Sequence, residues 1–388
     1  GANIPIRNCP MHDDGNGLFI GANGGLTQHI LIEKNYIYNN GIEGSQYEHN
    51  AYTAAIDIIF QYNHFGPLRE GTFGNNLKDR SAGTVVRYNW IKGGSRLIDL
   101  VDAEDSEVLV DHPSYSTTHV YGNILIKPEA PGNSQVLHYG GDSGTLDDYR
   151  KGDLYFYNNT VISTRDGNTT LINLSTNEET MHLFNNVLYN TASGNYFALI
   201  DGNGIVNMNN NWIKPSWKQC HCDPDGTIND LGDNIEEEDP LFENFDTQNF
   251  KPLVSSSLVD NGDALPGFLI TDHNIDMEYV KHVEMTTRYE SGYLDIGAYE
   301  NDFGLGIKQV TTSHDEVNLY PNPAESVLNI QVRNEFDFKI INSLGQEVLT
   351  GNSTKSFLSL SIQNLPRGLY FIEITSEGKY TTKKFVKN

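Results

Sequence analysis

Lys34-Asn35-Tyr36-Ile37 returns along the chain as Tyr62-Asn63-His64-Phe65, as Tyr88-Asn89-Trp90-Ile91 and in further copies. The Asn of this phrase recurs at positions 8, 35, 63, 89, 123, 159, 186 and 211, which are 27, 28, 26, 34, 36, 27 and 25 residues apart. Alternating β-branched and aromatic residues flank each copy, and stretches rich in Gly and Asn follow. Because a unit of this size made of short strands cannot bury its apolar face alone, the units must stack as the coils of a β-solenoid.

The repeated Asn predicts a ladder of side chains along the solenoid. Asn tolerates the left-handed backbone of a tight turn, and its side-chain amide can bond to the Asn one coil away. We therefore expect Asn35, Asn63 and Asn89 to be vertical neighbours, with about 4.8 Å between the strands of successive coils.

Two phrases mark the end of the repeat, Asp239-Pro240-Leu241-Phe242 and Asp295-Ile296-Gly297-Ala298-Tyr299-Glu300. Together with the Asn repeat, they resemble the right-handed parallel β-helix proteins of the pectate-lyase-like group. The resemblance implies an all-β chain with a right-handed parallel β-helix solenoid over residues 1–300. Such helices normally begin with a cap, whereas Gly1 leads directly into the first repeat, so we expect N-terminal coils to be missing.

The charge of the chain limits its partners. The 388 residues include 26 Lys and Arg against 51 Asp and Glu, a formal charge of -25. This argues against nucleic acid or an anionic membrane surface as a partner, and no apolar run reaches the roughly 18 residues of a transmembrane segment. A polyanionic substrate would need a local basic patch or a bridging cation. Cys9, Cys220 and Cys222 are a poor set for zinc, and we assign them no chemistry.

The composition changes after residue 316. Residues 317–388 hold 8 Lys and Arg and 6 Asp and Glu, so this tail is +2 and residues 1–316 are -27. Its short alternating stretches predict a small antiparallel β-sandwich, joined to the helix by a polar linker over residues 301–316.

Phrases in this tail, Leu319-Tyr320-Pro321-Asn322-Pro323 and Leu365-Pro366-Arg367-Gly368-Leu369-Tyr370, are similar to the C-terminal sorting domain of type IX secretion substrates. The resemblance implies the type IX machinery as a partner through residues 317–388. It also implies a protein that is secreted by a Bacteroidetes-like bacterium or attached to its outer surface.

A polar patch is predicted if residues that follow the ladder Asn of their coil by the same number of positions, here called the offset, stack on one another. Offset +15 gives Asn50, Lys78, Glu104 and His138, whereas +14 gives the mostly apolar series His49, Leu77, Ala103 and Leu137. Since strand side chains alternate, the odd offsets should face solvent. Lys78 is then expected beside Asn50 and Glu104, and Arg80 two residues further along the same face.

This patch suits β-elimination on a uronic-acid polysaccharide, which needs a neutraliser for the carboxylate, a base for the C5 proton and an acid for the leaving oxygen. Arg80 with Asn50 is one candidate neutraliser, and a Ca²⁺ ion is another. Lys78, its pKa lowered by the neighbouring Arg80, is the candidate base, and Tyr52 or His138 the acid. The Ca²⁺ ligands would be Asp102, Glu104 and Asp105, and the polysaccharide would be bound by Glu48, His49, Asn50, Asn76 and Arg96.

Two other functions stay open at this point. A glycoside hydrolase or epimerase would use two carboxylates, in a hydrolase about 5 to 5.5 Å apart for retention or 6.5 to 9.5 Å for inversion. The candidates are Asp99, Asp102, Glu104 and Asp105. A non-catalytic surface protein would bind glycan along the flat face of the helix through Tyr, Trp and Asn side chains. The motifs of the pectate, alginate and chondroitin lyase families are not matched, so no residue role is carried over from them.

Overall fold

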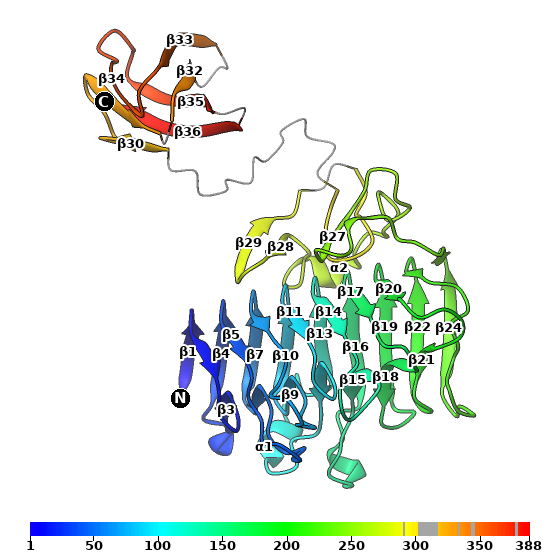
Figure 1. Ribbon diagram of the computed structural model, residues 1–388. Helices are drawn as coiled ribbons and strands as arrows, with labels where there is room; N and C mark the ends of the chain where they lie inside the picture. The colour runs from blue at the N-terminus through cyan, green and yellow to red at the C-terminus, as the bar shows by residue number, and fades with distance from the viewer. Residues whose placement is uncertain (290–291, 302–316, 333, 343–345, 377–378) are drawn as a thin grey trace. The chain divides into compact units, whose positions relative to one another are not determined.

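A computed structural model describes residues 1–289, 292–301, 317–332, 334–342, 346–376 and 379–388 (Figure 1). The chain divides into two compact units, Gly1–Gly304 and Leu305–Asn388. The first is built on long parallel sheets and the second on small antiparallel ones, which confirms the predicted all-β fold class. The expected linker over residues 301–316 lies outside the described residues except for Asn301.

The first unit is a parallel β-helix in which successive coils add one strand each to three sheets (Figure 1). Sheet A has nine strands in the order β1 (Ala2–Arg7), β4 (Gln28–Glu33), β7 (Ile56–Gln61), β10 (Ala82–Arg87), β13 (Thr117–Tyr121), β16 (Gly152–Tyr157), β19 (Glu179–Phe184), β22 (Ile205–Asn209) and β24 (Thr227–Gly232). Sheet B has nine in the order β2 (Pro10–His12), β5 (Tyr36–Tyr38), β8 (His64–Phe65), β11 (Trp90–Lys92), β14 (Ile124–Lys127), β17 (Thr160–Ser163), β20 (Val187–Asn190), β23 (Trp212–Ile213) and β25 (Ile235–Glu236).

Sheet C is shorter, with β3 (Leu18–Ile20), β6 (Ala51–Thr53), β9 (Leu77–Asp79), β12 (Ile98–Leu100), β15 (Gln135–Tyr139), β18 (Thr169–Leu174) and β21 (Phe197–Ile200). Three short helices lie in the connections from sheet C to sheet A: η1 (Asn23–Gly25), α1 (Glu107–Val110) and η2 (Leu146–Asp148). The inward side chains of the three sheets form one apolar core, to which Ile58, Phe65 and Leu77 contribute from β7, β8 and β9.

The predicted Asn ladder is present. Asn63 donates its Nδ2 to Oδ1 of Asn89 over 3.0 Å, and Asn35 donates to Asn63 over the same distance. The series continues through Asn123, Asn159, Asn186 and Asn211, and then to Asn234, which the repeat analysis missed.

The start of the ladder and its backbone differ from the prediction. The backbone N–H of Cys9 donates to Oδ1 of Asn35, so Cys9 and not Asn8 occupies the first position. The left-handed residue is the one before each ladder Asn, as at Tyr62 with φ 57° and Tyr88 with φ 54°. The ladder Asn is therefore selected for its amide hydrogen bonds, and its neighbour takes the strained backbone.

The segment that closes the first unit covers the outside of two of the three sheets. It contains β26 (Phe242–Asn244), β27 (Asn249–Pro252), α2 (Gly267–Ile270), β28 (Met277–Val280) and β29 (Glu284–Thr287). Phe250 and Tyr279 pack on Trp90 of sheet B, and α2 contributes Leu269 to a cluster with tyrosines of sheet A. The apolar clusters of this segment involve the outer faces of sheets A and B, and a cleft opens on sheet C.

The second unit has two antiparallel sheets around one apolar core. One sheet has the order β30 (Asn318–Tyr320), β31 (Val327–Gln331) and β34 (Phe357–Ser361). The other has the order β33 (Glu347–Ser353), β32 (Phe336–Asn342), β35 (Gly368–Ser376) and β36 (Lys379–Lys387). Leu328 and Ile330 of the first sheet and Ile340 and Ile372 of the second are fully buried between them.

Candidate functional site

The outer face of sheet C carries a column of polar side chains. Strand pairing places Tyr52 of β6 beside Lys78 of β9, Lys78 beside Asp99 of β12, and Asp99 beside His138 of β15. Phe19 of β3 and Asn173 of β18 continue the column at its two ends. Lys78 is thus flanked by a phenol on one side and a carboxylate on the other.

The prediction that Asn50 and Glu104 lie beside Lys78 was wrong, because the register of sheet C differs from the expected one. Lys78 and His138 follow their ladder Asn by 15 residues (78 − 63 and 138 − 123), but Tyr52 follows by 17 (52 − 35) and Asp99 by only 10 (99 − 89). The turn between sheets B and C changes length from coil to coil, so a constant offset from the ladder does not define a column on sheet C.

Asn50 and Asn76 face the interior and do not form part of an outer binding surface. Asn40 donates to Asn50 over 2.9 Å, and Asn50 donates to Asn76 over 2.7 Å, so these side chains form a second, internal amide ladder. All three are fully buried. The role in substrate binding predicted for Asn50 and Asn76 does not fit this burial, because a buried turn needs amides to satisfy its backbone as much as a cleft needs them for a ligand.

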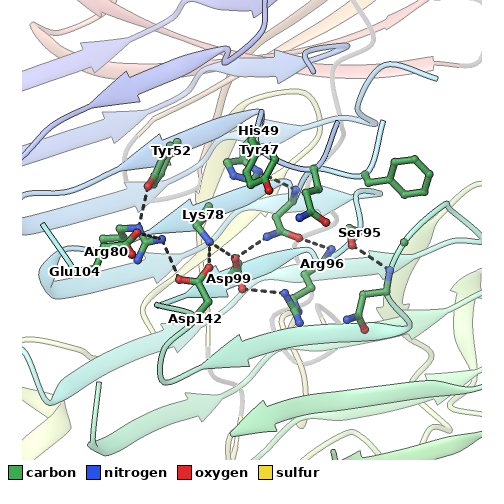
Figure 2. A pocket seen from close by; sticks show the side chains of 15 residues that line it. Tyr47, His49, Tyr52, Lys78, Arg80, Ser95, Arg96, Asp99, Glu104 and Asp142 are labelled. Carbon is green, nitrogen blue, oxygen red and sulfur yellow. Dashed lines mark hydrogen bonds and ion pairs between the residues drawn. The ribbon is translucent and has the colours of Figure 1, made fainter. Parts of the chain in front are cut away.

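A cleft of about 660 Å³ opens over this column (Figure 2). Six of the residues predicted for the site line it: Tyr52, Lys78, Arg80, His49, Arg96 and Glu104. The other lining residues are Gln46, Tyr47, Phe73, Asn75, Ser95, Asp99, Gly132, Asn133 and Asp142. Glu48, Asp105 and His138, predicted for the same site, are not among the lining residues.

Lys78 and Arg80 hold one carboxylate between them. Asp142 accepts from Nη2 of Arg80 through Oδ1 at 2.9 Å, and from Nζ of Lys78 through Oδ2 in a short ion pair. Figure 2 shows Asp142 in this bridging position. Both cationic side chains are more than 90% buried, whereas that of Asp142 is 35% exposed. Lys78 and Arg80 are therefore held in the wall of the cleft, and the carboxylate of Asp142 contacts them from the side that faces solvent.

The charge state of Lys78 is opposite to the prediction. Burial disfavours its ammonium, but the carboxylates of Asp99, at 3.1 Å, and Asp142 outweigh burial and raise the pKa of Lys78 above its ordinary value. Arg80 does act in the lowering direction, as expected, but it is the weaker influence. Lys78 is a permanent cation at neutral pH, and a role as a neutral amine base does not fit this environment.

Tyr52 is the half-exposed proton-carrying group next to this cation pair. Arg80 donates its Nε–H to the phenolic oxygen over 2.9 Å, so the hydroxyl proton of Tyr52 must point away from the guanidinium. The ring is held edge to face by Phe19 and by His49. Arg80 is in turn fixed by an ion pair with Glu104 at 2.9 Å.

Asp99 is a buried carboxylate that organises the floor of the cleft. It accepts from Lys78, from Nδ2 of Asn75 at 2.6 Å and from Nδ1 of His138 at 2.8 Å. Burial alone would raise the pKa of Asp99, but His138 and Lys78 hold it well below its usual range. The other ring nitrogen of His138 lies 2.9 Å from Ser175 Oγ, so this buried ring orients Asp99 and is not placed to act as an acid on a substrate.

His49 stays neutral in the wall of the cleft. Its Nδ1 accepts the backbone N–H of Asn75 over 2.9 Å, which leaves the proton on Nε2. Burial, helped by the charge of Lys78, lowers the pKa of His49 to about 4. At neutral pH this side chain can only donate a hydrogen bond to a ligand.

Arg96 supplies the third cation of the cleft. Its Nη1 lies 3.4 Å from Asp99, its Nε donates to Gln135 over 2.7 Å, and its side chain is 20% exposed. It lies on the side of Asp99 away from Arg80 (Figure 2).

The three carboxylates predicted to bind Ca²⁺ do not converge. Asp102 is fully buried, where its Oδ1 accepts the backbone N–H of Asp142, while Glu104 and Asp105 are exposed. Within the described part of the chain, the one group of three possible ligands close together is Asp201, Cys220 and Cys222, and these two cysteines form a disulfide.

Asp142 is the charged cleft residue that the sequence analysis missed. It lies in Gly140-Gly141-Asp142-Ser143-Gly144, directly after β15. A Gly-rich loop that leaves the strand carrying His138 was a usable signal, because such loops carry binding residues more often than the strands they join.

Comparison with known families identifies the second unit. Residues 318–388 match the family of secretion system C-terminal sorting domains. Comparison with curated proteins found no match to the chain. Among the described residues, no helix is long and apolar enough to cross a membrane. The protein is thus a parallel β-helix that carries a type IX sorting domain and is secreted or attached to the outer surface of a Bacteroidetes-type bacterium.

Proposed function

We propose that the cleft on sheet C binds a uronate residue of an acidic polysaccharide and cleaves the chain there by β-elimination. One observation carries the proposal: Lys78 and Arg80 already hold the two oxygens of one carboxylate, that of Asp142. A uronate carboxylate that displaced Asp142 would meet the same two cations, one at each oxygen. Two buried cations in a cleft of this size satisfy the first requirement of the reaction, neutralisation of the substrate charge.

Tyr52 is the group best placed to move protons. With its carboxylate neutralised, the uronate can lose its C5 proton to the phenolate oxygen of Tyr52. The electron pair of the C5–H bond becomes the C4–C5 double bond, the bond from C4 to the leaving oxygen breaks, and that oxygen takes a proton from the phenol or from water. The Nε–H of Arg80, donated to the Tyr52 oxygen, stabilises the negative charge which the base form needs.

A retaining glycoside hydrolase is the second candidate. Asp142 Oδ1 and Glu104 Oε1 each lie 2.9 Å from the same nitrogen of Arg80, so these oxygens are at most 2.9 + 2.9 = 5.8 Å apart. This fits the spacing of about 5 to 5.5 Å between the carboxyl groups of retaining enzymes. Such an enzyme also needs one protonated carboxyl, whereas Lys78 and Arg80 lower the pKa of Asp142 against the effect of burial. This favours the lyase.

Uronate polysaccharides of different composition, incubated with and without chelator, test both candidates and whether Ca²⁺ serves as the alternative neutraliser. The lyase predicts ultraviolet absorbance from the unsaturated product, and the hydrolase predicts new reducing ends without that absorbance. A glycan-binding protein without catalytic activity would give neither.

Substitutions of Lys78 test the mechanism. Lys78→Ala is expected to lower the elimination rate by about 10² to 10³, because it removes one of two donors to the carboxylate. Lys78→Arg should recover part of the rate, since in this mechanism Lys78 acts by its charge. Exposed Lys218→Ala is the control. An arginine variant as inactive as the alanine variant, while equally folded, would instead support an amine base.

A further inference from the structure

A second cleft, of about 320 Å³, lies on the outer face of sheet A, under the closing segment. Its floor is formed by β16, β19 and β22. Its walls are formed by Leu231 of β24 and by four residues of the closing segment, Asp263, Ala264, Pro266 and Phe268. All these residues belong to the first unit, and none lines the cleft on sheet C.

Two columns of stacked rings end inside this cleft. Tyr155 stacks on His182 with ring centroids 4.7 Å apart and planes 11° apart, and in the next column Tyr157 stacks on Phe184 at 5.0 Å and 4°. In the following coil, strand pairing puts Asn207 after His182 and Asn209 after Phe184. Among the described residues, no further ring therefore stacks on the faces of His182 and Phe184 that point along the helix.

The small amides leave a ledge where the next pair of rings would stand. Phe268, which is 61% exposed and packs edge to face on Tyr155, closes one side of the ledge. The position of His182 is fixed by Asp153, 2.7 Å from its Nε2. Asp263 is fixed by two hydrogen bonds of 2.8 Å between its backbone and the side chain of Asn185. The ledge is thus preformed.

The polar groups around the ledge suit hydroxyls and not a charge. Asn207 accepts from Asn229 through Oδ1 at 2.9 Å, which leaves its amide N–H groups for a ligand. Asn209 and Asp263 supply further oxygens at the rim. No Lys or Arg is among the lining residues, and Asp263 repels anions, in contrast to the three cations of the cleft on sheet C.

We infer that this ledge is a binding site for a neutral sugar ring of a polysaccharide. The apolar C–H face of a pyranose continues the two ring stacks, and its hydroxyl groups reach Asn207, Asn209 and Asp263. The volume fits a single ring at the lower end of small-ligand sites. The site does not depend on the chemistry of the cleft on sheet C.

Calorimetric titration of the whole protein with neutral hexasaccharides of glucose, xylose, mannose and galactose, and with a galacturonate hexamer, tests this site. At least one neutral hexamer should bind, and Phe268→Ala should weaken that binding by about tenfold. Asn207→Tyr should weaken it at least as much, because the substitution removes the amide that meets the sugar hydroxyls and the added ring extends the stack and fills the ledge.

Lys78→Ala in the first cleft and exposed Phe357→Ala in the sorting domain are the controls, and both should bind the neutral sugar as the parent does. The inference is overturned if no neutral hexamer binds, or if the folded Phe268 and Asn207 variants bind the neutral hexamer as tightly as the parent does. It is also overturned if both variants lose binding of the galacturonate hexamer as much as they lose binding of the neutral one.

Discussion

In the proposed lyase, Asp142 occupies the position that the substrate carboxylate would take. Its carboxylate joins Lys78 to Arg80, it stands on a Gly-rich loop, and its side chain is the exposed member of the trio. If the proposal is right, Asp142 competes with the substrate carboxylate for the two cations, because neither cation can serve both carboxylates fully.

Substitution of Asp142 measures this competition. Asp142→Asn removes the internal charge, and we expect KM for uronate oligosaccharides to fall about threefold to tenfold, a change of roughly 1 kcal/mol, with kcat little changed. Steady-state kinetics at fixed salt provide the measurement, with Asp147→Asn, an exposed residue of the following turn, as the control. A higher KM or a lost kcat would instead make Asp142 part of the catalytic or structural machinery.

At the scale of elements, the ladder of Asn side chains joins successive coils. Asn89 donates to the backbone of Phe60 and Arg87 and to Oδ1 of Asn123, and it accepts from the backbone and side chain of Asn63. Each ladder residue thus satisfies buried groups on both neighbouring coils, where water cannot replace it.

Asn89→Ala should therefore lower the free energy of unfolding by about 3 kcal/mol, because it leaves several buried donors and acceptors without partners. Asn195→Ala, in an exposed turn, should change it by less than about 0.5 kcal/mol. Urea denaturation of both variants measures the difference. Equal midpoints would show that the ladder follows from the coil geometry and does not stabilise it.

The whole molecule buries several histidines in neutral form. Burial is the main cause that lowers the pKa of His49 to about 4, and of His64 and His119 each to about 3. In the unfolded chain these groups titrate near 6.5, so between pH 6.5 and 4 the unfolded state binds protons that the folded state does not. The stability that these neutral histidines contribute is therefore fully present above about pH 6.5, and it is lost as the pH falls through this window.

The melting temperature should accordingly fall between pH 6.5 and 5, before most carboxylates titrate. The titration of His49 alone should lower the free energy of unfolding by about 3 kcal/mol by pH 4. Thermal unfolding at a series of pH values measures the trend, and His49→Gln should flatten it. A melting temperature constant from pH 7 to 5 would contradict these buried neutral histidines.

The division into two units has its own consequence. Each unit has a separate apolar core, and the matched sorting domain covers only residues 318–388. A chain that ends at Asn301 should keep the melting transition of the β-helix and any activity of its cleft, while export is lost. Differential scanning calorimetry and a secretion assay test the two parts. A truncated chain that folds but is inactive would place the tail in the function of the first unit.

The sequence by itself determined the coil repeat, the ladder from Asn35 to Asn211 and the character of the tail. These features are periodic or local. An Asn whose amide bonds to the equivalent Asn one coil away recurs at regular intervals, so the repeat is visible in the sequence. It also brought Tyr52, Lys78 and Arg80 to one cleft, because residues near each other in successive coils of a solenoid are neighbours in space.

Only the tertiary structure decided how the groups of the cleft pair. The turns between sheets B and C differ in length, so Asp99 and not Glu104 is the strand neighbour of Lys78. Asn50 and Asn76 turned inward because the interior of a turn must satisfy its own backbone. The charge of Lys78 depends on Asp142, which is 64 residues away in the sequence. A pKa is set by every charge near the group in space, and the sequence displays only those that are near along the chain.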